Sequence, residues 1–570
     1  MTDQPTEQPT GRPTEQPTGR PADPAADEVE EQASLLSNSA VMAAGTTVSR
    51  LSGFVRAALL SYALGAGVHA DIFTVSNTLP NALYILLAGG IFNAVLVPQL
   101  IRAMRNDPDR GDAYTNRVVT AAGTFLVVVT VVLVVAAPLL VRLFTHGYEG
   151  EVFDSAVAFT RYCLPQVFFY GMFVLVGQIL NARGVFGPMM WAPIANNIVS
   201  VAVILLYLGA YGVAEGDAVH GGFTSGQELL LGVGSTLGIA VQFLILLPYL
   251  RRAGFRYRPR FDLRGTGLGH TLRLGVWTVL FVVVNQVAFV VVQRLATSGA
   301  IASPDGTGAT VYANSFLVVM VPHSIVTVSL ATAMLPRLSA HAADHDPHGL
   351  AGSLAGTLRA ALAVIVPFVA LLPVIAPDLA RVIFAHGAAA DNGVDAYVPT
   401  LSLFGVGILF FTFHYLVLRG FYALELNRTA FFVQCIVAGT NIVAAVTLVA
   451  AASAAHTSPA LVVAYSTAYA VGAAISYLML SHRLGGLRSR RLLVFGGRLV
   501  VATGLAIGLT FPVAQVLDNL ADDPGTVVAA GRLISVCAVD VLLFLVFARL
   551  LRISEVNDVL AAVTRRARAR

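Results

Sequence analysis

The 570-residue sequence contains no lysine, only three cysteines and two tryptophans, and 12% charged residues. So few charges cannot cover the surface of a water-soluble protein of this length. The cysteines lie far apart in apolar segments and predict neither disulfides nor a metal site. We also find no GxxxxGK[ST] loop, zinc motif or nucleophile elbow. These absences argue against a soluble enzyme, and they predict no cofactor, no bound metal and no direct use of ATP.

What the sequence has in abundance is hydrophobic residues, at 56%, with a mean hydropathy of +0.74. Apolar runs of 18 or more residues recur along the chain, and each is long enough to cross a hydrocarbon core of about 30 Å as a helix. The fold class we predict is an all-α polytopic membrane protein with about fourteen transmembrane helices. We expect these near residues 39–62, 72–101, 118–145, 155–182, 187–211, 229–251, 271–296, 308–338, 353–384, 396–424, 429–453, 460–482, 493–517 and 526–550.

All 36 basic residues are arginine, and they gather in every second loop between the predicted helices. Short loops rich in positive charge stay in the cytoplasm. This pattern predicts a multi-pass protein of the bacterial inner membrane with both termini cytoplasmic. It is a signature of topology, so we expect membrane lipids as neighbours and no nucleic-acid partner.

The first 34 residues are polar and proline-rich, and they repeat the unit TEQPTGRP at residues 6–13 and 14–21. This composition is typical of a disordered cytoplasmic tail. A docking site for envelope-synthesis proteins is the alternative interpretation. Residues 553–570 are predicted to form a second, basic cytoplasmic tail.

Two distant segments, residues 137–147 and 376–387, share Pro, Arg, Phe, His and Gly in the same order. Six predicted helices separate them, so both copies would have the same orientation. We therefore predict two parallel six-helix repeats, in residues 35–252 and 253–484, followed by two additional helices in 485–552. Repeated halves are typical of transporters that rock around a path between them.

Charged residues within a membrane helix cost about 2.5–3.5 kcal/mol and usually face a cavity. Arg50 and Arg56 lie in the first predicted helix and are our candidates for holding an anionic head group, because a guanidinium matches phosphate oxygens. Snorkelling to the interface is the alternative for each. Arg294 is a weaker candidate that can equally anchor at the interface. We interpret Asp71 as a cap of its own helix rather than an ion site.

Three amides, Asn81, Asn285 and Gln286, complete the candidates for cavity or gating roles. Glycine and proline mark places where helices can bend, as alternating access needs. Such signals occur at Pro80-Asn81, Gly89-Gly90, Pro322-His323, and Gly405 with Gly407.

One ordered run of motifs carries a family resemblance. It consists of TVSRLSGFVR (47–56), GAG (65–67), ADIF (70–73), LPN (79–81), GIF (90–92) and VP (97–98). The run resembles the opening of the lipid II flippase family (MurJ/MviN), within the multidrug, oligosaccharidyl-lipid and polysaccharide exporter superfamily. The resemblance covers essentially the whole membrane region. It implies a polyprenyl-pyrophosphate-linked glycan as substrate, with the family's cavity arginines at Arg50 and Arg56 and its second-helix acid at Asp71.

The sequence departs from the family pattern where charges are usual. Ala57 replaces an acid, Tyr84 and Ile85 replace an arginine pair, and Gly89 replaces a glutamate. The eighth predicted helix carries Asn314 in the segment where the family often has an arginine. The cavity is therefore expected to be less cationic than the family's.

The function we predict is movement of lipid II from the inner to the outer leaflet by alternating access, driven by membrane potential or an ion gradient. One alternative is an exporter of another polyprenyl-linked glycan or a multidrug antiporter, although an antiporter would need more intramembrane acids. A second alternative is a non-transporting scaffold for envelope synthesis. Deleting residues 1–34 should abolish the function of a scaffold and spare that of a flippase.

Overall fold

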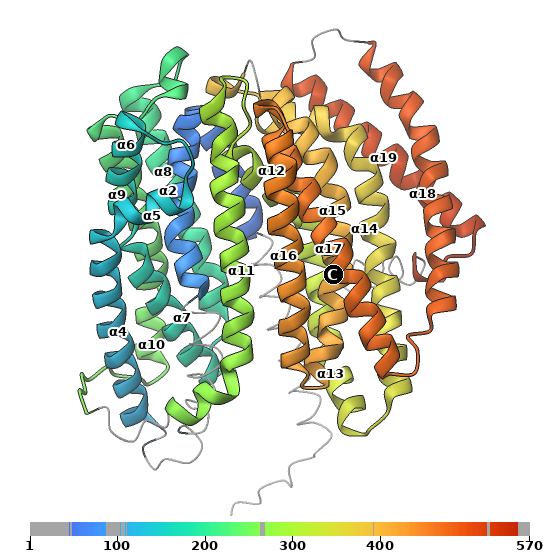
Figure 1. Ribbon diagram of the computed structural model, residues 1–570, viewed down its shortest axis with the longest axis horizontal. Helices are drawn as coiled ribbons and strands as arrows, with labels where there is room; N and C mark the ends of the chain where they lie inside the picture. The colour runs from blue at the N-terminus through green and yellow to red at the C-terminus, as the bar shows by residue number, and fades with distance from the viewer. Residues whose placement is uncertain are drawn as a thin grey trace, which may run out of the picture.

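The computed structural model describes residues 48–86, 111–262, 268–390, 393–520 and 525–556, together with positions 45, 103 and 109. Every regular element within these residues is a helix, which confirms the predicted all-α fold (Figure 1). Twelve helical segments in this part of the chain are long and apolar enough to cross a membrane. The second predicted helix runs into residues outside the described ranges, so the count of fourteen stays a prediction.

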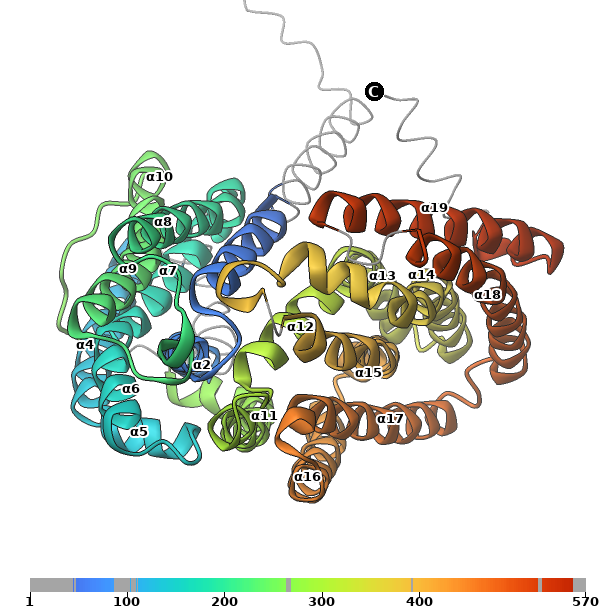
Figure 2. The same ribbon diagram turned by 90° about the horizontal axis from the view of Figure 1, so that it is seen from above.

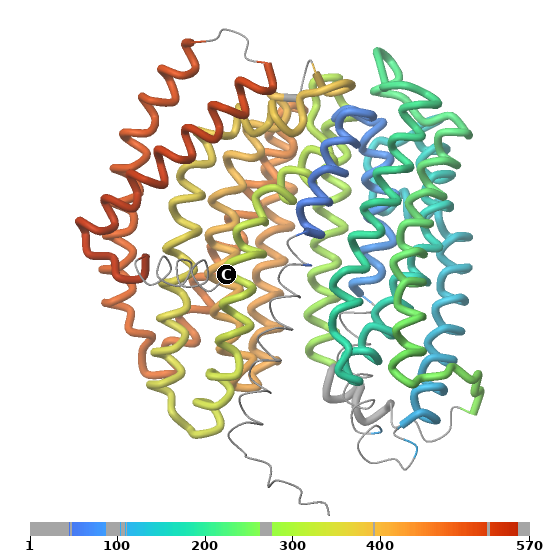
Figure 3. The backbone as a smooth tube through the Cα atoms, turned by 180° about the vertical axis from the view of Figure 1, so that it is seen from behind, coloured from blue at the N-terminus to red at the C-terminus, as the bar shows by residue number. Residues whose placement is uncertain are grey.

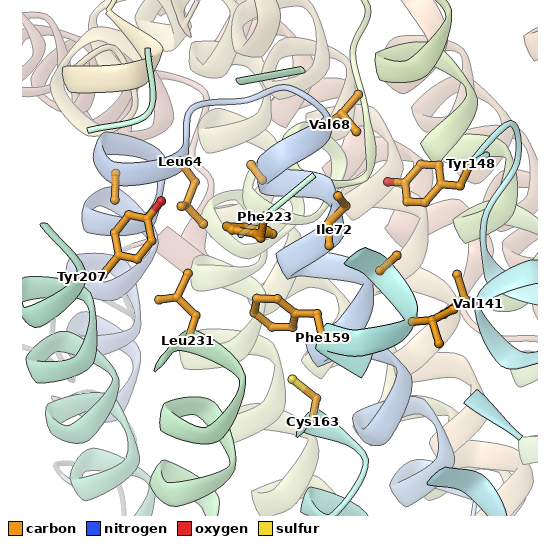
Figure 4. Close-up of a cluster of buried hydrophobic side chains, with 14 of the residues drawn as sticks. Leu64, Val68, Ile72, Val141, Tyr148, Phe159, Cys163, Tyr207, Phe223 and Leu231 are labelled. Atoms are coloured by element: carbon orange, nitrogen blue, oxygen red, sulfur yellow. The ribbon is translucent and has the colours of Figure 1, made fainter. Parts of the chain in front are cut away.

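The first bundle begins with a helix at residues 48–64 and is drawn in blue to green in Figure 1. Its core near one end combines residues from several helices, among them Leu64, Ile72, Phe159 and Tyr207 (Figure 4). The other helices of this bundle are α2 (Val68–Tyr84), α4 (Asp112–Val135), α5 (Ala137–Phe144), α6 (Gly150–Cys163), α7 (Gln166–Ala182), α8 (Gly187–Tyr211), α9 (Ser225–Leu244) and α10 (Leu246–Arg252).

Helix α4 illustrates why these segments are helical. Beyond its first turns its sequence is rich in valine, leucine, threonine and alanine, and side chains such as Val131 and Val135 are exposed on the outside of the bundle. Such side chains are stable only against lipid, and in lipid the backbone must satisfy its own hydrogen bonds, which a helix does.

The second bundle contains α11 (Leu268–Ala302), α12 (Ala309–Pro322), α13 (Val328–Ala343), α14 (Pro347–Ile383), α15 (Gly393–Ala423), α16 (Asn427–Ala451) and α17 (Thr457–Arg483). A single π-helical turn, His323–Thr327, joins α12 to α13. It follows Pro322, which lacks the backbone N–H that a regular helix would use. The irregularity predicted at Pro322-His323 is thus a π-helical turn within one continuous helical segment, Ala309–Ala343, and not a break.

Two further helices, α18 (Ser489–Asp518) and α19 (Thr526–Leu550), lie at the edge of the second bundle against α14 (Figures 2 and 3). Arg532 of α19 ties them to it, with ion pairs of 3.0 Å to Asp378 of α14 and 2.6 Å to Asp518 of α18. This is the predicted pair outside the repeats.

The two ends of the bundles differ in arginine content. Loops 145–149, 212–224, 303–308 and 384–390 carry no arginine and lie at one end, which we name the arginine-poor end. Loops 253–262 and 484–488 carry arginine at the opposite, arginine-rich end. In Figure 1 the arginine-poor end is at the top.

The repeated segments end alike at the arginine-poor end. Phe144 and Phe384 are both buried, and Gly147 and Gly387 follow them with φ of 74° and 56°. A positive φ favours glycine, which explains why this residue recurs in both copies. The two segments therefore end in the same way in the two halves, in agreement with the repeat.

Each of these repeated loops contacts the first helix of the opposite bundle. The backbone N–H of His146 donates to Thr297 Oγ1 of α11 at 2.9 Å. Reciprocally, the hydroxyl of Ser61 in the first helix donates to the carbonyl of Phe384 at 3.2 Å. Two contacts of this kind thus join the bundles at the arginine-poor end.

Candidate functional site

A cavity of about 660 Å³ lies between the two bundles. Its walls come from the first helix, α2, α7, α8 and α9 of the first bundle and from α12 and the following π-helical turn of the second. Its polar lining residues are Ser49, Arg50, Arg56, Thr74, Asn77, Thr78, Asn81, Gln166, Tyr170, Asn196, Asn197, Ser200, Ser235, Asn314 and Ser324. This is the size of a ligand site.

Both arginines predicted from the first helix line this cavity. The Nε atom of Arg56 is buried and finds no hydrogen-bond partner among the described residues, whereas the Arg50 side chain is exposed. No aspartate or glutamate is found in the described lining. A buried guanidinium is normally paired, so this positive charge is available to an anion that enters.

Helix α2 presents a polar stripe to the cavity. Thr74, Asn77, Thr78 and Asn81 recur at intervals of three and four residues, which places them on one face of the helix. The Nε2 atom of Gln166 at the start of α7 donates to Asn77 Oδ1 at 3.2 Å. This stripe supplies neutral donors and acceptors opposite the arginines.

Helix α8 holds the first helix in place. Asn197 Nδ2 donates to Ser52 Oγ at 2.8 Å and to the carbonyl of Ser49 at 3.1 Å. Because these contacts lie on either side of Arg50 and one turn before Arg56, they fix the helix segment from which both guanidinium groups project.

The second bundle contributes an uncharged wall. Asn314 of α12 lines the cavity and donates to the Tyr397 hydroxyl at 3.0 Å. On the other side, Tyr84 stacks on the lining residue Tyr170 with ring centroids 4.9 Å apart. At the positions where the family pattern has arginine, this chain thus has the amide of Asn314 and the ring of Tyr84, which stacks on Tyr170. Gly89 lies outside the described residues.

Asp71 lies one turn from the lining residue Thr74, and its contacts correct our expectation. Its oxygens accept hydrogen bonds from the backbone N–H groups of Ala309 at 2.9 Å and Thr310 at 2.7 Å. Asp71 therefore caps α12 of the opposite bundle, not its own helix. A carboxylate at a helix N-terminus is favourable for both the hydrogen bonds and the helix dipole.

Next to it, the hydroxyls of Thr74 and Thr310 lie 2.8 Å apart. We name these contacts, together with the two repeated-loop contacts, the seam. The next turns of the same helices, with Asn77 and Asn314, line the cavity. The seam therefore lies next to the cavity, on its arginine-poor side.

The remaining predicted residues lie outside the cavity lining. Arg294 is exposed and donates to the carbonyls of Arg142 and Thr145, the latter at 2.8 Å, so it lies beside the loop contact of His146 in the seam. Asn285 accepts from Gln434 Nε2 at 2.7 Å within the second bundle. Gln286 donates to the carbonyl of Ala82 across the bundles.

Our sequence reasoning missed most of the polar lining, although a signal for it exists. Asn196, Asn197 and Ser200 follow Pro193 at helical spacing, as the polar residues of α2 do. Polar residues repeated on one face of an apolar helix indicate a face turned away from lipid. Applied to each predicted helix, this criterion would have found α2 and α8.

Solved structures show what this fold is similar to. A structure described as "Lipid II flippase MurJ, inward closed conformation" matches with a TM-score of 0.69 at 16% identity, covering 89% of this chain and 98% of that one. An inward-facing multidrug resistance MATE family transporter of the MOP superfamily matches with a TM-score of 0.59 at 15% identity, over 77% and 96% of the two chains. These likenesses concern the fold.

Curated relatives are also similar in sequence. The probable lipid II flippase MurJ of Vibrio cholerae is 27% identical over 418 residues, which cover 70% of this chain and 75% of that protein. The lipid II flippase MurJ of Burkholderia cenocepacia is 26% identical over 398 residues, covering 67% and 72%. The model of the family described as "Lipid II flippase MurJ" matches residues 60–520, most of the chain. The chain therefore belongs to the lipid II flippase MurJ family, a family of transporters rather than enzymes.

Proposed function

We propose that the protein moves lipid II, the polyprenyl-pyrophosphate-linked peptidoglycan precursor, from the inner to the outer leaflet of the bacterial inner membrane. The observation that carries this proposal is the cavity in which Arg56 and Arg50 have no acidic partner among the described residues. A pyrophosphate supplies the missing negative charge, and a guanidinium binds its oxygens through two parallel hydrogen bonds. The neutral amides of α2 and α8 suit the sugar hydroxyls.

The direction of transport follows from charge. We place the arginine-rich end, and both termini, in the cytoplasm because positive loops remain there. With the cell interior negative, moving two negative charges outward releases roughly 4–5 kcal/mol per 100 mV. The membrane potential thus suffices to drive the step, and an ion gradient can add to it.

The mechanism we propose is alternating access. With the seam formed, the cavity is closed at the arginine-poor, outer end, so the head group enters from the cytoplasmic side while the polyprenyl tail stays in lipid. Separation of Asp71 from the N-terminus of α12 then opens the seam. The two halves rock about the cavity, and the head group leaves outward.

A second candidate substrate shares the same pyrophosphate. Asn314, Tyr84 and Ala57 stand where the family pattern has charges, so part of the usual head-group recognition is changed. Another polyprenyl-pyrophosphate-linked glycan fits this cavity as well, whereas a cationic drug finds no carboxylate in the described lining.

The test compares two arginines. The protein is depleted in its host and replaced by wild type, Arg56→Gln or Arg161→Gln. Arg161 is an exposed arginine of α6 outside the cavity lining, so it matches the loss of charge without touching the proposed site. The measurement is the amount of lipid II accessible to a membrane-impermeant reagent outside the cell.

We expect accessible lipid II to fall on depletion, to be restored by wild type and Arg161→Gln, and to stay low with Arg56→Gln. If both variants restore it fully, the cavity is not the transport site. If depletion leaves lipid II accessible but removes another surface glycan, the second substrate is correct.

A further inference from the structure

A second cavity, of about 920 Å³, lies at the arginine-rich end between α14, the start of α18 and the residues after α19. We name it the basin. Six arginines line it: Arg359, Arg488, Arg490, Arg491, Arg498 and Arg552. Its described lining contains one acid, Glu555. The basin lies outside the cavity between the two bundles, and its lining shares no residue with it.

The single acid is already used. Glu555 accepts from Arg359 Nη1 at 2.6 Å through one oxygen and from Ser554 Oγ at 3.1 Å through the other. The other five arginines enter none of the ion pairs found among the described residues. The basin is thus a pocket with a large uncompensated positive charge.

Membrane topology does not explain this concentration. Positive loops orient a membrane protein by their number of arginines, wherever in the loop these lie. Here Arg359 of α14, the segment 488–498 and Arg552 come from three separate parts of the sequence and meet in one place. Like charges brought together repel, so the arrangement is stabilised when an anion lies between them.

The start of α18 adds to the positive potential. Its N-cap residue Arg488 has a φ of 52° and provides no side-chain acceptor for the first turn of the helix. The N-terminus of a 30-residue helix therefore faces the basin without a capping side chain. A helix N-terminus in this state favours negative charge and binds phosphate oxygens.

An apolar stripe continues from the basin along the same face of α18. Arg491, Val494 and Arg498 line the basin. Val501, Leu505 and Leu509 continue this face at helical spacing and are 51%, 47% and 52% exposed. A free phosphate would use only the arginines, whereas a lipid would place its head group in the basin and its acyl chain on the stripe.

We propose that the basin binds the phosphodiester head group of an anionic phospholipid from the adjoining leaflet, with an acyl chain along the Val501–Leu509 face of α18. Basic pockets between membrane helices recognise anionic head groups in this way. The lipid would hold α18 and the end of α19 against α14. This proposal does not depend on which substrate the central cavity carries.

The experiment measures lipid binding by the purified full-length chain in a neutral detergent with native mass spectrometry. The ligands are phosphatidylglycerol, zwitterionic phosphatidylcholine and the water-soluble head group glycerophosphoglycerol. The test variant is Arg490→Gln/Arg491→Gln/Arg498→Gln. The control is Arg251→Gln/Arg256→Gln/Arg258→Gln, which removes three exposed arginines near the same end but outside the basin.

We expect phosphatidylglycerol to bind at least tenfold tighter than the other two ligands. Each arginine near an anionic lipid contributes about 1 kcal/mol, or roughly fivefold, so the loss of three arginines in the test variant should weaken binding about 100-fold. The control should change it less than about threefold. Both triple variants must elute like the wild-type protein in gel filtration. If the test variant does not, the single variants Arg498→Gln and Arg258→Gln are compared instead. We then expect about a fivefold loss of binding for Arg498→Gln alone.

Equal losses in test and control variants would overturn the proposal, because binding would then reflect net charge alone. Equal affinity for phosphatidylcholine would overturn it as well. If glycerophosphoglycerol binds as tightly as the lipid, the basin is a site for free phosphate compounds and the acyl-chain part is wrong.

Discussion

The seam and the central cavity are neighbours on the same helices, yet they are built in opposite ways. In the seam, the Asp71 carboxylate is matched by the N–H groups of Ala309 and Thr310. The next turns of α2 and α12 line the cavity, where Arg56 of the first helix has no matching charge among the described residues. The comparison teaches that charged groups are paired within the protein where the two bundles contact each other. Where we propose that a ligand binds, a charged group is left for the ligand to pair with.

The largest effect is expected from removing the unmatched charge. Arg56→Gln should lower the rate of lipid II transport about 10- to 100-fold, because a hydrogen bond to a charged group contributes about 1.5–3 kcal/mol. Arg50→Gln should lower it roughly threefold, since that side chain is exposed and screened by water. Transport into proteoliposomes with an imposed potential measures both. An equal loss of transport rate in the two variants would show that the different burial of the two arginines does not determine their contributions.

Steric disruption of the seam should have the next largest effect. A Cβ at Gly387 would overlap the carbonyl oxygen of Tyr62 in the opposite bundle. Overpacking of this kind costs about 2 kcal/mol, so Gly387→Ala should shift the population away from the closed seam about 30-fold. The measurement is labelling of a single Thr78→Cys in the cavity by an impermeant maleimide from outside, with Cys163, Cys435 and Cys537 replaced by serine.

Gly150→Ala is the matched control for this variant. Gly150 has a similar φ of 53° at the same end, but a Cβ there meets nothing within 4 Å. It therefore carries the same backbone strain without the clash. If Gly150→Ala increases labelling as much as Gly387→Ala does, strain and not contact between the halves explains the result.

Removing the charge from the seam should have a smaller effect. In Asp71→Asn the amide NH₂ group faces a backbone N–H of α12 and cannot accept its hydrogen bond. Loss of a helix cap costs about 1 kcal/mol, which predicts roughly fivefold more labelling of Thr78→Cys from outside. Asp217→Asn, an exposed acid at the same end, should leave labelling unchanged.

The smallest effect is expected from the tail. A chain lacking residues 1–34 should transport lipid II within about twofold of wild type, because the arginines and seam contacts that we propose to act in transport lie later in the chain and the composition of the tail is that of a disordered segment. The same proteoliposome assay measures it. Full loss of function in cells together with normal transport in proteoliposomes would instead support the scaffold role of the tail.

The sequence predicted what depends on local pattern. Apolar runs located the helices, the cost of a buried charge singled out Arg50 and Arg56, and Pro322 marked the π-helical turn. Each of these follows from residues within a few turns of one another, so no knowledge of the packing was needed.

What the sequence did not predict depends on how distant segments pack. The hydrogen bonds that Asp71 accepts from Ala309 and Thr310 join residues 238 and 239 positions apart, and nothing near Asp71 in the sequence indicates them. The basin likewise assembles Arg359, Arg498 and Arg552 from three segments that each look like an ordinary positive loop or helix end. Such sites appear only once the bundles are placed against each other.

The reciprocal contacts of the two repeated loops have a consequence for the origin of the molecule. In each half, the loop that ends the repeated segment contacts the first helix of the other half, with His146 donating in one case and Phe384 accepting in the other. In a homodimer of identical six-helix subunits, symmetry would generate both contacts from a single surface, as any isologous interface does. After gene fusion the single chain would retain this interface, and the two copies could then diverge in sequence. One copy would come to carry the cavity arginines, and the other would form the uncharged wall of the cavity.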